Sequence, residues 1–230
     1  MHKKGKMSKS EGLIDAAQEG DLDEVKRLIA EGANVNLHDD HGRTSLMKAS
    51  SWGHPEIVAL LIENGANVNA SDDFGSTALI DASVVGHEGI VRMLLDKGAD
   101  SSCRDDEGST ALMIACRKGK PGIVKLLMDK KKKPNLKDHY YNMAFFEACS
   151  KGYLDIVKLF IEKGVDVNAK YNLIEAAEKG HAEIVKLLIE NGADINTKGY
   201  SGITALEAAT DNSHTDVMKL LADKGAKFKS

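Results

Sequence analysis

The 230-residue sequence has little cysteine, few aromatic residues and no long apolar run. Three cysteines are an odd number and too few for a disulfide framework, so we expect free thiols in a reducing compartment. No apolar stretch approaches the roughly 20 residues of a membrane span, and the basic N-terminal residues lack the apolar core of a signal peptide. These absences predict a soluble, cytoplasmic protein without a membrane span.

The sequence also lacks the short motifs that mark common active sites. It contains no Gly-rich phosphate loop, no HExxH pair, no CxxC pair and no GxSxG turn. Cys116 and Cys149 hold equivalent places in ACRKG and ACSKG, with no His or Asp at catalytic spacing, so we expect them to be small core residues. We therefore expect no enzymatic activity, no cofactor and no metal.

What the sequence does contain is a repeat with a period of 33 residues. Its apolar fraction of 42% is mostly Ala, Leu, Ile and Val, and its 21 glycines recur at regular places. The period is marked by Leu13, Leu46, Leu79, Leu112 and Phe145, and after one step of 28 residues by Leu173 and Leu206. We expect a basic tail at 1–10 and one domain at 11–229, with repeats at about 11–38, 39–71, 72–104, 105–137, 138–170, 171–198 and 199–229.

Each repeat reads as two short helices. In the repeat at 72–104, Thr77 is placed to cap the first helix, and Gly98 follows the second helix where a left-handed residue is favoured. The second helix carries one apolar stripe, made by Ile90, Val91, Leu94 and Leu95. Because two short helices cannot bury such a stripe alone, we expect the repeats to stack into an all-α solenoid.

These repeats resemble the ankyrin-repeat family, whose period is also 33 residues. The resemblance covers about residues 11–229 and rests on RTSLMKASSWGHPEIVALLIENGANVNA, STALIDASVVGHEGIVRMLLDKGAD and HAEIVKLLIENGADIN. It implies a helix-turn-helix solenoid with short β-hairpin fingers. It also implies a non-catalytic scaffold that binds a partner protein, and we expect the chain to be a monomer.

Three departures from the family pattern predict irregular structure in repeats four to six. Lys131 stands where glycine belongs, and a lysine at positive φ costs roughly 1 kcal/mol. In repeat five, Tyr141 replaces the finger glycine and Met143 replaces the capping threonine. Repeat six lacks five residues before Leu173, so we expect a truncated finger there.

Histidines recur at one position of the repeat, as His54, His87, His181 and His214. They cannot share one zinc ion, because packed helices lie roughly 8 to 10 Å apart. We expect each imidazole to bond within its own inter-helix turn.

Acidic residues lead successive fingers, beginning with Asp39, Asp72, Asp105 and Asp138. The resemblance implies that these carboxylates bond the backbone of the turn and that the next residues are exposed tips. A row of acidic tips facing a partner is a further hypothesis.

The resemblance places the partner on a concave face, made by the finger tips and the exposed sides of the first helices. By register this face comprises Asp40, His41, Arg43, Trp52, Asp73, Phe74, Val84, Val85, Asp106, Glu107, Arg117, Lys118, His139, Tyr140 and Lys151. We expect Trp52, Phe74, Val84 and Val85 to form an apolar anchor with an acidic and basic rim. The alternative for Trp52 is packing over the neighbouring repeat.

Charge distribution leaves other functions open. Residues 117–137 hold nine Lys and Arg and one Asp, which is consistent with a solvated edge or with contact to nucleic acid or another anionic surface. The segment has no aromatic residue for base stacking, which makes nucleic acid the weaker alternative. The chain could also be the binding arm or regulatory subunit of an enzyme complex, or act inside a host cell.

Overall fold

The computed structural model describes residues 8–130, 138–199 and 201–227, and the chain divides into two compact units between Ile114 and Ala115. The first unit contains α1 (Lys9–Glu19), α2 (Leu22–Ala30), α3 (Ser45–Trp52), α4 (Pro55–Glu63), α5 (Ala78–Val85), α6 (Glu88–Asp96) and the start of α7 (Ala111–Arg117). The second contains the end of α7, then α8 (Pro121–Lys130), α9 (His139–Lys151), α10 (Leu154–Glu162), the 3₁₀ helix η1 (Ala169–Tyr171), α11 (Asn172–Glu178), α12 (Ala182–Glu190), α13 (Ala205–Asp211) and α14 (Thr215–Asp223). The predicted all-α repeat architecture is confirmed.

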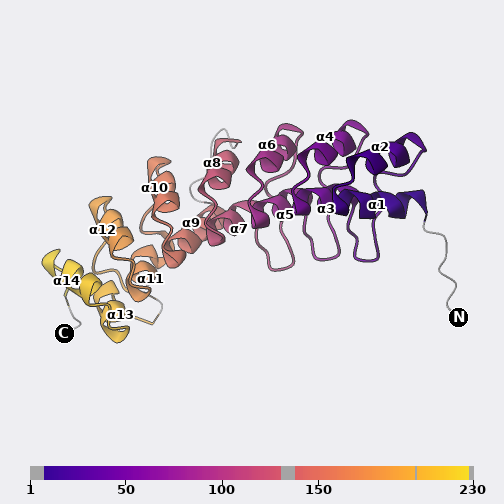
Figure 1. Ribbon diagram of the computed structural model, residues 1–230. Helices are drawn as coiled ribbons and strands as arrows, with labels where there is room; N and C mark the ends of the chain where they lie inside the picture. Colours follow the sequence, from indigo (N-terminus) through magenta and orange to yellow (C-terminus); the bar gives the residue numbers. More distant parts are fainter. Residues whose placement is uncertain (1–7, 131–137, 200, 228–230) are drawn as a thin grey trace, which may run out of the picture. The chain divides into compact units, whose positions relative to one another are not determined.

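In the first unit the helices form two layers (Figure 1). The first helices α1, α3 and α5 pack side by side, and the second helices α2, α4 and α6 form the other row. The loops before α3 and α5 extend from the first row, away from the second. The stripe of α6 is buried as predicted, with Val91 and Leu94 fully inaccessible. Side chains of both layers therefore make one core, and the fingers and the outward side of the first helices meet solvent.

Threonine caps begin the first helices where the sequence predicts them. The Oγ1 atoms of Thr44, Thr77, Thr110 and Thr204 each accept a hydrogen bond of 3.3 Å from the backbone N–H three residues later. These bonds satisfy N–H groups that the helix itself leaves unpaired. The helix starts are thus fixed locally, repeat by repeat.

Each finger in the first unit is closed by one antiparallel bridge, at His38 and Thr44, Ser71 and Thr77, and Arg104 and Thr110. The carboxylate of Asp72 accepts from the backbone N–H groups of Phe74 at 3.0 Å and Ser76 at 2.8 Å. Asp39 accepts from His41 and Arg43 in the same way, and Asp105 accepts from Ser109. The predicted role of the leading aspartates is confirmed for these three fingers.

Neighbouring fingers are also joined to each other. The backbone N–H of Asp73 donates to the carbonyl of His41 at 3.1 Å, and that of Asp106 donates to the carbonyl of Phe74 at 2.8 Å. Because both bonds are between backbone groups, they fix the tips without using any side chain. The first unit therefore presents its finger tips from a connected frame.

The finger predicted for repeat five does not form, so the assignment of His139 and Tyr140 to a finger tip is wrong. Asp138 instead caps α9, and its carboxylate accepts from the N–H of Tyr140 at 2.9 Å. The physical reason is the loss of both the finger glycine and the capping threonine. Tyr141, in the glycine position, is buried and packs edge-on against Phe160 with ring centroids 4.9 Å apart.

The shortened connection before α11 contains η1 in place of a finger, and Tyr171 adopts a left-handed φ of 57° there. This agrees with the truncation expected from the five missing residues. Lys131 and the rest of 131–137 lie outside the described residues, so the altered turn expected at Lys131 stays a prediction.

The recurring histidines bond across repeats, which corrects the expectation that they bond within their own turns. Nε2 of His54 donates to the carbonyl of Gln18 at 3.1 Å, and His181 and His214 donate to the carbonyls of Ser150 at 3.0 Å and Glu178 at 2.8 Å. His87 holds the same place, and its buried Nε2 has no hydrogen-bond partner among the described residues. The glycine that ends each preceding first helix leaves the space that the ring needs.

A ladder of asparagines also links consecutive repeats. Asn69 donates from Nδ2 to the carbonyl of Gly98 at 3.2 Å and accepts from the N–H of Asp100 at 2.8 Å. Asn36 and Asn168 make the same pair of bonds to their next repeats. This ladder was not predicted, although the recurrence of Asn at the repeat spacing is a signal for it. Each rung satisfies two backbone groups of the next loop.

Candidate protein-interaction surface

Four large apolar side chains are exposed in the first unit, and we call them the apolar quartet: Trp52, Phe74, Val84 and Val85. Their exposed fractions are 61%, 56%, 38% and 46%. Among the described residues only Tyr153, in the second unit, joins them as an exposed large hydrophobic side chain. With 61% of its surface exposed, Trp52 leaves most of its side chain open to solvent.

The quartet lies on adjacent elements that the fold fixes. Trp52 ends α3 and Val85 ends α5, at equivalent positions of two helices that pack against each other. Phe74 lies on the finger that leads into α5. Its N–H is held by Asp72 and its carbonyl by Asp106, so the backbone that carries this ring is bonded on both sides. The apolar groups are thus displayed by a rigid support.

The basic residues near the quartet are engaged in ion pairs. Arg43, predicted as a rim residue, is half-buried and pairs with Asp81 of the next repeat, whose other oxygen accepts from Ser76 Oγ at 2.9 Å. Lys48 pairs with Asp39 at 3.3 Å. No other Lys or Arg occurs in residues 28–91. Both positive charges of residues 28–91 are therefore matched by carboxylates, and Arg104 adds an exposed cation on the third finger.

Burial dominates the electrostatics of Asp81. It raises the pKa of this carboxyl to about 6, against the opposing effects of the Arg43 guanidinium and the Ser76 hydroxyl. The Asp72 carboxylate adds to the rise, and Lys48 opposes it. The Arg43–Asp81 pair nevertheless links two repeats beneath the surface, and the sequence pattern did not predict it.

The predicted tip residues are exposed. Asp40, His41, Asp73, Asp106 and Glu107 all lie at the ends of the three bridged fingers. With Arg43 and Lys48 paired, the tips give this side of the first unit an acidic border. Most of the charged residues at these tips are carboxylates, and Arg43, the basic residue predicted for the rim, is present but paired with Asp81.

The remaining predicted site residues belong to the second unit. Arg117 pairs with Glu147 at 3.2 Å and is partly buried, whereas Lys118 and Lys151 are exposed. His139 and Tyr140 lie in the first turn of α9, with their rings edge to face at 5.4 Å. The structure thus groups the first ten predicted residues in one unit and these five in the other.

A family model described as ankyrin repeats matches this chain in three copies, over residues 13–105, 98–171 and 170–230. The chain belongs to the ankyrin-repeat family. The solved structure of the human ASB11 ankyrin repeat domain is similar, with 28% sequence identity and a TM-score of 0.83, and the match covers 94% of this chain and 99% of that one. No curated protein matches the sequence. Ankyrin repeats are generic protein-protein interaction modules.

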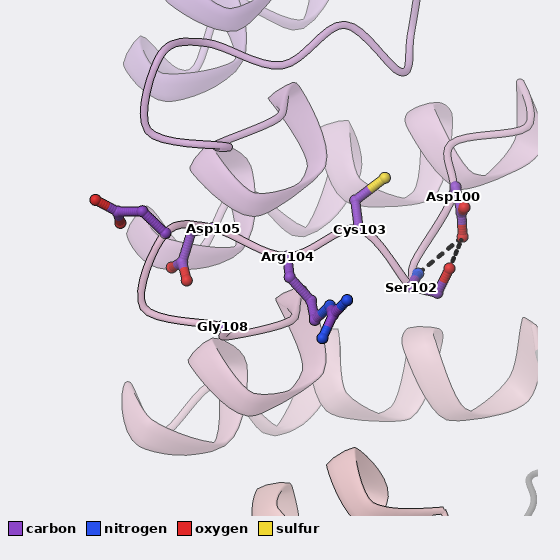
Figure 2. A pocket seen from close by; sticks show the side chains of 7 residues that line it. Asp100, Ser102, Cys103, Arg104, Asp105 and Gly108 are labelled. Atoms are coloured by element: carbon purple, nitrogen blue, oxygen red, sulfur yellow. Dashed lines mark hydrogen bonds between the residues drawn. The ribbon is translucent and has the colours of Figure 1, made fainter.

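One polar pocket of about 460 Å³ in this ankyrin-repeat chain lies where the asparagine ladder has a different residue. Ser102 occupies the ladder position, and it bonds Asp100 of its own loop through N–H at 2.8 Å and Oγ at 2.6 Å (Figure 2). Cys103 also lines the pocket, and burial, together with the Asp100 charge, raises the pKa of its thiol. That shift disfavours the reactive thiolate form of Cys103.

The other two cysteines of this ankyrin-repeat chain lie in its core. Cys116 and Cys149 are fully buried, as predicted, and burial raises the pKa of both thiols. No group of three His, Cys, Asp or Glu side chains able to hold a metal occurs within the described ranges. No helix in the part of the chain that the structure describes is long and apolar enough to cross a bilayer.

Proposed function

We propose that this ankyrin-repeat chain is a non-catalytic scaffold that binds a protein partner through the apolar quartet and the acidic finger tips of its first unit. The observation that carries the proposal is the exposure of Trp52 and Phe74, at 61% and 56%, on a hydrogen-bonded support. Large aromatic side chains contribute most to affinity when a partner buries them, and they lose little conformational entropy in doing so. A rim of charged tips fits the polar border of such interfaces.

The position of the quartet supports binding rather than folding. The cores of the two helix layers are closed without it, since Leu46, Leu79, Ile57 and Leu61 are at most 2% exposed. The quartet adds exposed apolar area to a face that has no folding use for it. Exposed apolar patches of this kind mark interaction sites in proteins that are otherwise well packed.

The test is a quantitative affinity purification with the full chain. Trp52→Ala combined with Phe74→Ala should remove proteins that the wild-type chain retains, with the melting temperature nearly unchanged. Glu56→Ala combined with Glu63→Ala is the matched control, because both side chains are exposed on the second helix α4. A retained set that is the same for all three proteins would contradict the proposal.

A further inference from the structure

The two units differ strongly in charge. Residues 1–114 contain twenty Asp and Glu against eleven Lys and Arg, whereas residues 115–230 contain fifteen against twenty. The net charge of −4 for the chain hides this difference. The quartet lies in the acidic unit, so any partner that covers it approaches through a negative potential.

The charge near the quartet is more one-sided than the unit as a whole. Arg43 and Lys48 are the only Lys or Arg within residues 28–91, and they pair with Asp81 and Asp39. These pairs match the positive charge of residues 28–91, and the exposed Arg104, in the bridge of the third finger, adds a cation there. The exposed carboxylates of Asp40, Asp73 and Asp106 then stand on three successive fingers around Phe74.

The spacing of the finger-tip carboxylates determines which arrangement of charges a ligand needs. Backbone bonds connect the tips of Asp73 and Asp106 to their preceding fingers, so these carboxylates repeat at the spacing of the stacked repeats. Packed helices lie roughly 8 to 10 Å apart, which is about one Debye length at physiological salt. A cation near one tip therefore also interacts with its neighbour, and a segment with several cations gains from the whole row.

We propose that the partner presents a cationic segment, in which apolar side chains that cover Trp52 and Phe74 are flanked by Lys or Arg that face Asp40, Asp73 and Asp106. This inference rests on the proposed function and names the chemistry of its partner. Apolar burial supplies most of the affinity, and the charges supply selectivity and the rate of association. An acidic segment of equal apolar content is rejected by like charges at every finger.

The experiment selects short randomised linear peptides, displayed on phage, against the immobilised full chain. Peptides are then counter-selected on the Trp52→Ala and Phe74→Ala double variant, so that only ligands of the quartet remain. We expect the survivors to be enriched in Lys and Arg next to apolar residues. Affinity of a synthetic survivor should fall steeply as salt is raised.

Charge reversal tests the row of tips directly. Asp73→Lys with Asp106→Lys should weaken a selected peptide at least about tenfold. Glu56→Lys with Glu63→Lys changes the net charge equally on the second helix α4 and should weaken it less than about threefold. Equal weakening by both double variants would show that only net charge matters, which overturns the proposed contact with the tips.

The remaining outcomes distinguish a failure of the cationic-partner inference from a failure of the proposed interaction surface. Survivors that need Trp52 but show no enrichment in Lys or Arg would overturn the cationic partner and keep the interaction surface. A selection that yields no ligand dependent on Trp52 or Phe74 would overturn both. Concentration-dependent dimerisation of the free chain that Trp52→Ala abolishes would identify a second copy as the occupant, and would also overturn the inference.

Discussion

The imidazole of His54 lies against Gly20 of the preceding repeat so closely that a Cβ on this glycine would be 2.5 Å from the ring. Gly20 also has a left-handed φ of 81°, which disfavours any residue with a side chain. Two separate physical reasons therefore keep glycine at this position. They can be separated, because Gly32 has the same left-handed conformation, at φ 85°, with no atom within 4 Å of its Cβ position.

We predict that Gly20→Ala lowers the free energy of unfolding by about 3 kcal/mol, from backbone strain and from displacement of His54. Gly32→Ala should cost only about 1 kcal/mol, from strain alone. Urea unfolding of both variants measures the difference. Equal losses would mean that the imidazole moves aside freely and does not hold the repeats together.

The second prediction concerns the contribution of the asparagine ladder to stability. Asn69→Ala removes two inter-repeat hydrogen bonds, to Gly98 and Asp100, and should lower the free energy of unfolding by about 1 to 2 kcal/mol. Ser102→Ala at the equivalent position should cost less than about 0.5 kcal/mol, because the bonds that Ser102 makes among the described residues stay within its own exposed loop. Thermal and urea unfolding of the two variants test this. A larger loss for Ser102→Ala would refute it.

The raised pKa of Asp81 leads us to expect that the stability of the chain depends on pH. Its pKa of about 6 in the folded chain is above its ordinary value of 3.8, so the folded state binds more protons between these pH values. The contribution of Asp81 to stability is therefore complete below about pH 4 and falls as pH rises through about 6. The stability of the wild type relative to Asp81→Asn should decrease from about pH 4 to about pH 7.

Urea unfolding of both proteins across this range is the measurement, and Asp216→Asn, at an exposed position on α14, is the control. A relative gain for the wild type as pH rises would show that the Arg43 ion pair outweighs burial.

Trp52 gives a prediction on stability rather than binding. Because its side chain is 61% exposed, Trp52→Ala should lower the free energy of unfolding by less than about 1 kcal/mol. Leu46→Ala, in the core of the same helix α3, should cost about 2 to 5 kcal/mol. The fluorescence of Trp52, the only tryptophan, should be red-shifted and readily quenched by acrylamide in the free chain. Emission typical of a buried indole would contradict the structure.

Local, repeated features were predictable from the sequence because each has a cause within a few residues. The threonine caps and the left-handed glycines belong to this class, whereas the turn-bonding role of the leading aspartates came from the resemblance to ankyrin repeats. The Arg43 pair was not predictable, since Asp81 is 38 residues away and approaches only when the repeats stack. The histidine bonds were assigned to the wrong partners for the same reason. At Asp138 the local pattern differs from that of the other repeats. Met143 replaces the threonine that would cap the helix, so α9 begins earlier and Asp138 caps it instead.

The bonds between neighbouring fingers have a consequence for how this family member can diversify. They run from the N–H groups of Asp73 and Asp106 to the carbonyls of His41 and Phe74, so they do not depend on which side chains these residues carry. Replacing the tip side chains leaves the frame that displays them intact. Substitutions at the finger tips therefore leave the backbone bonds between fingers in place. The surface that the tips present can change without a change of fold.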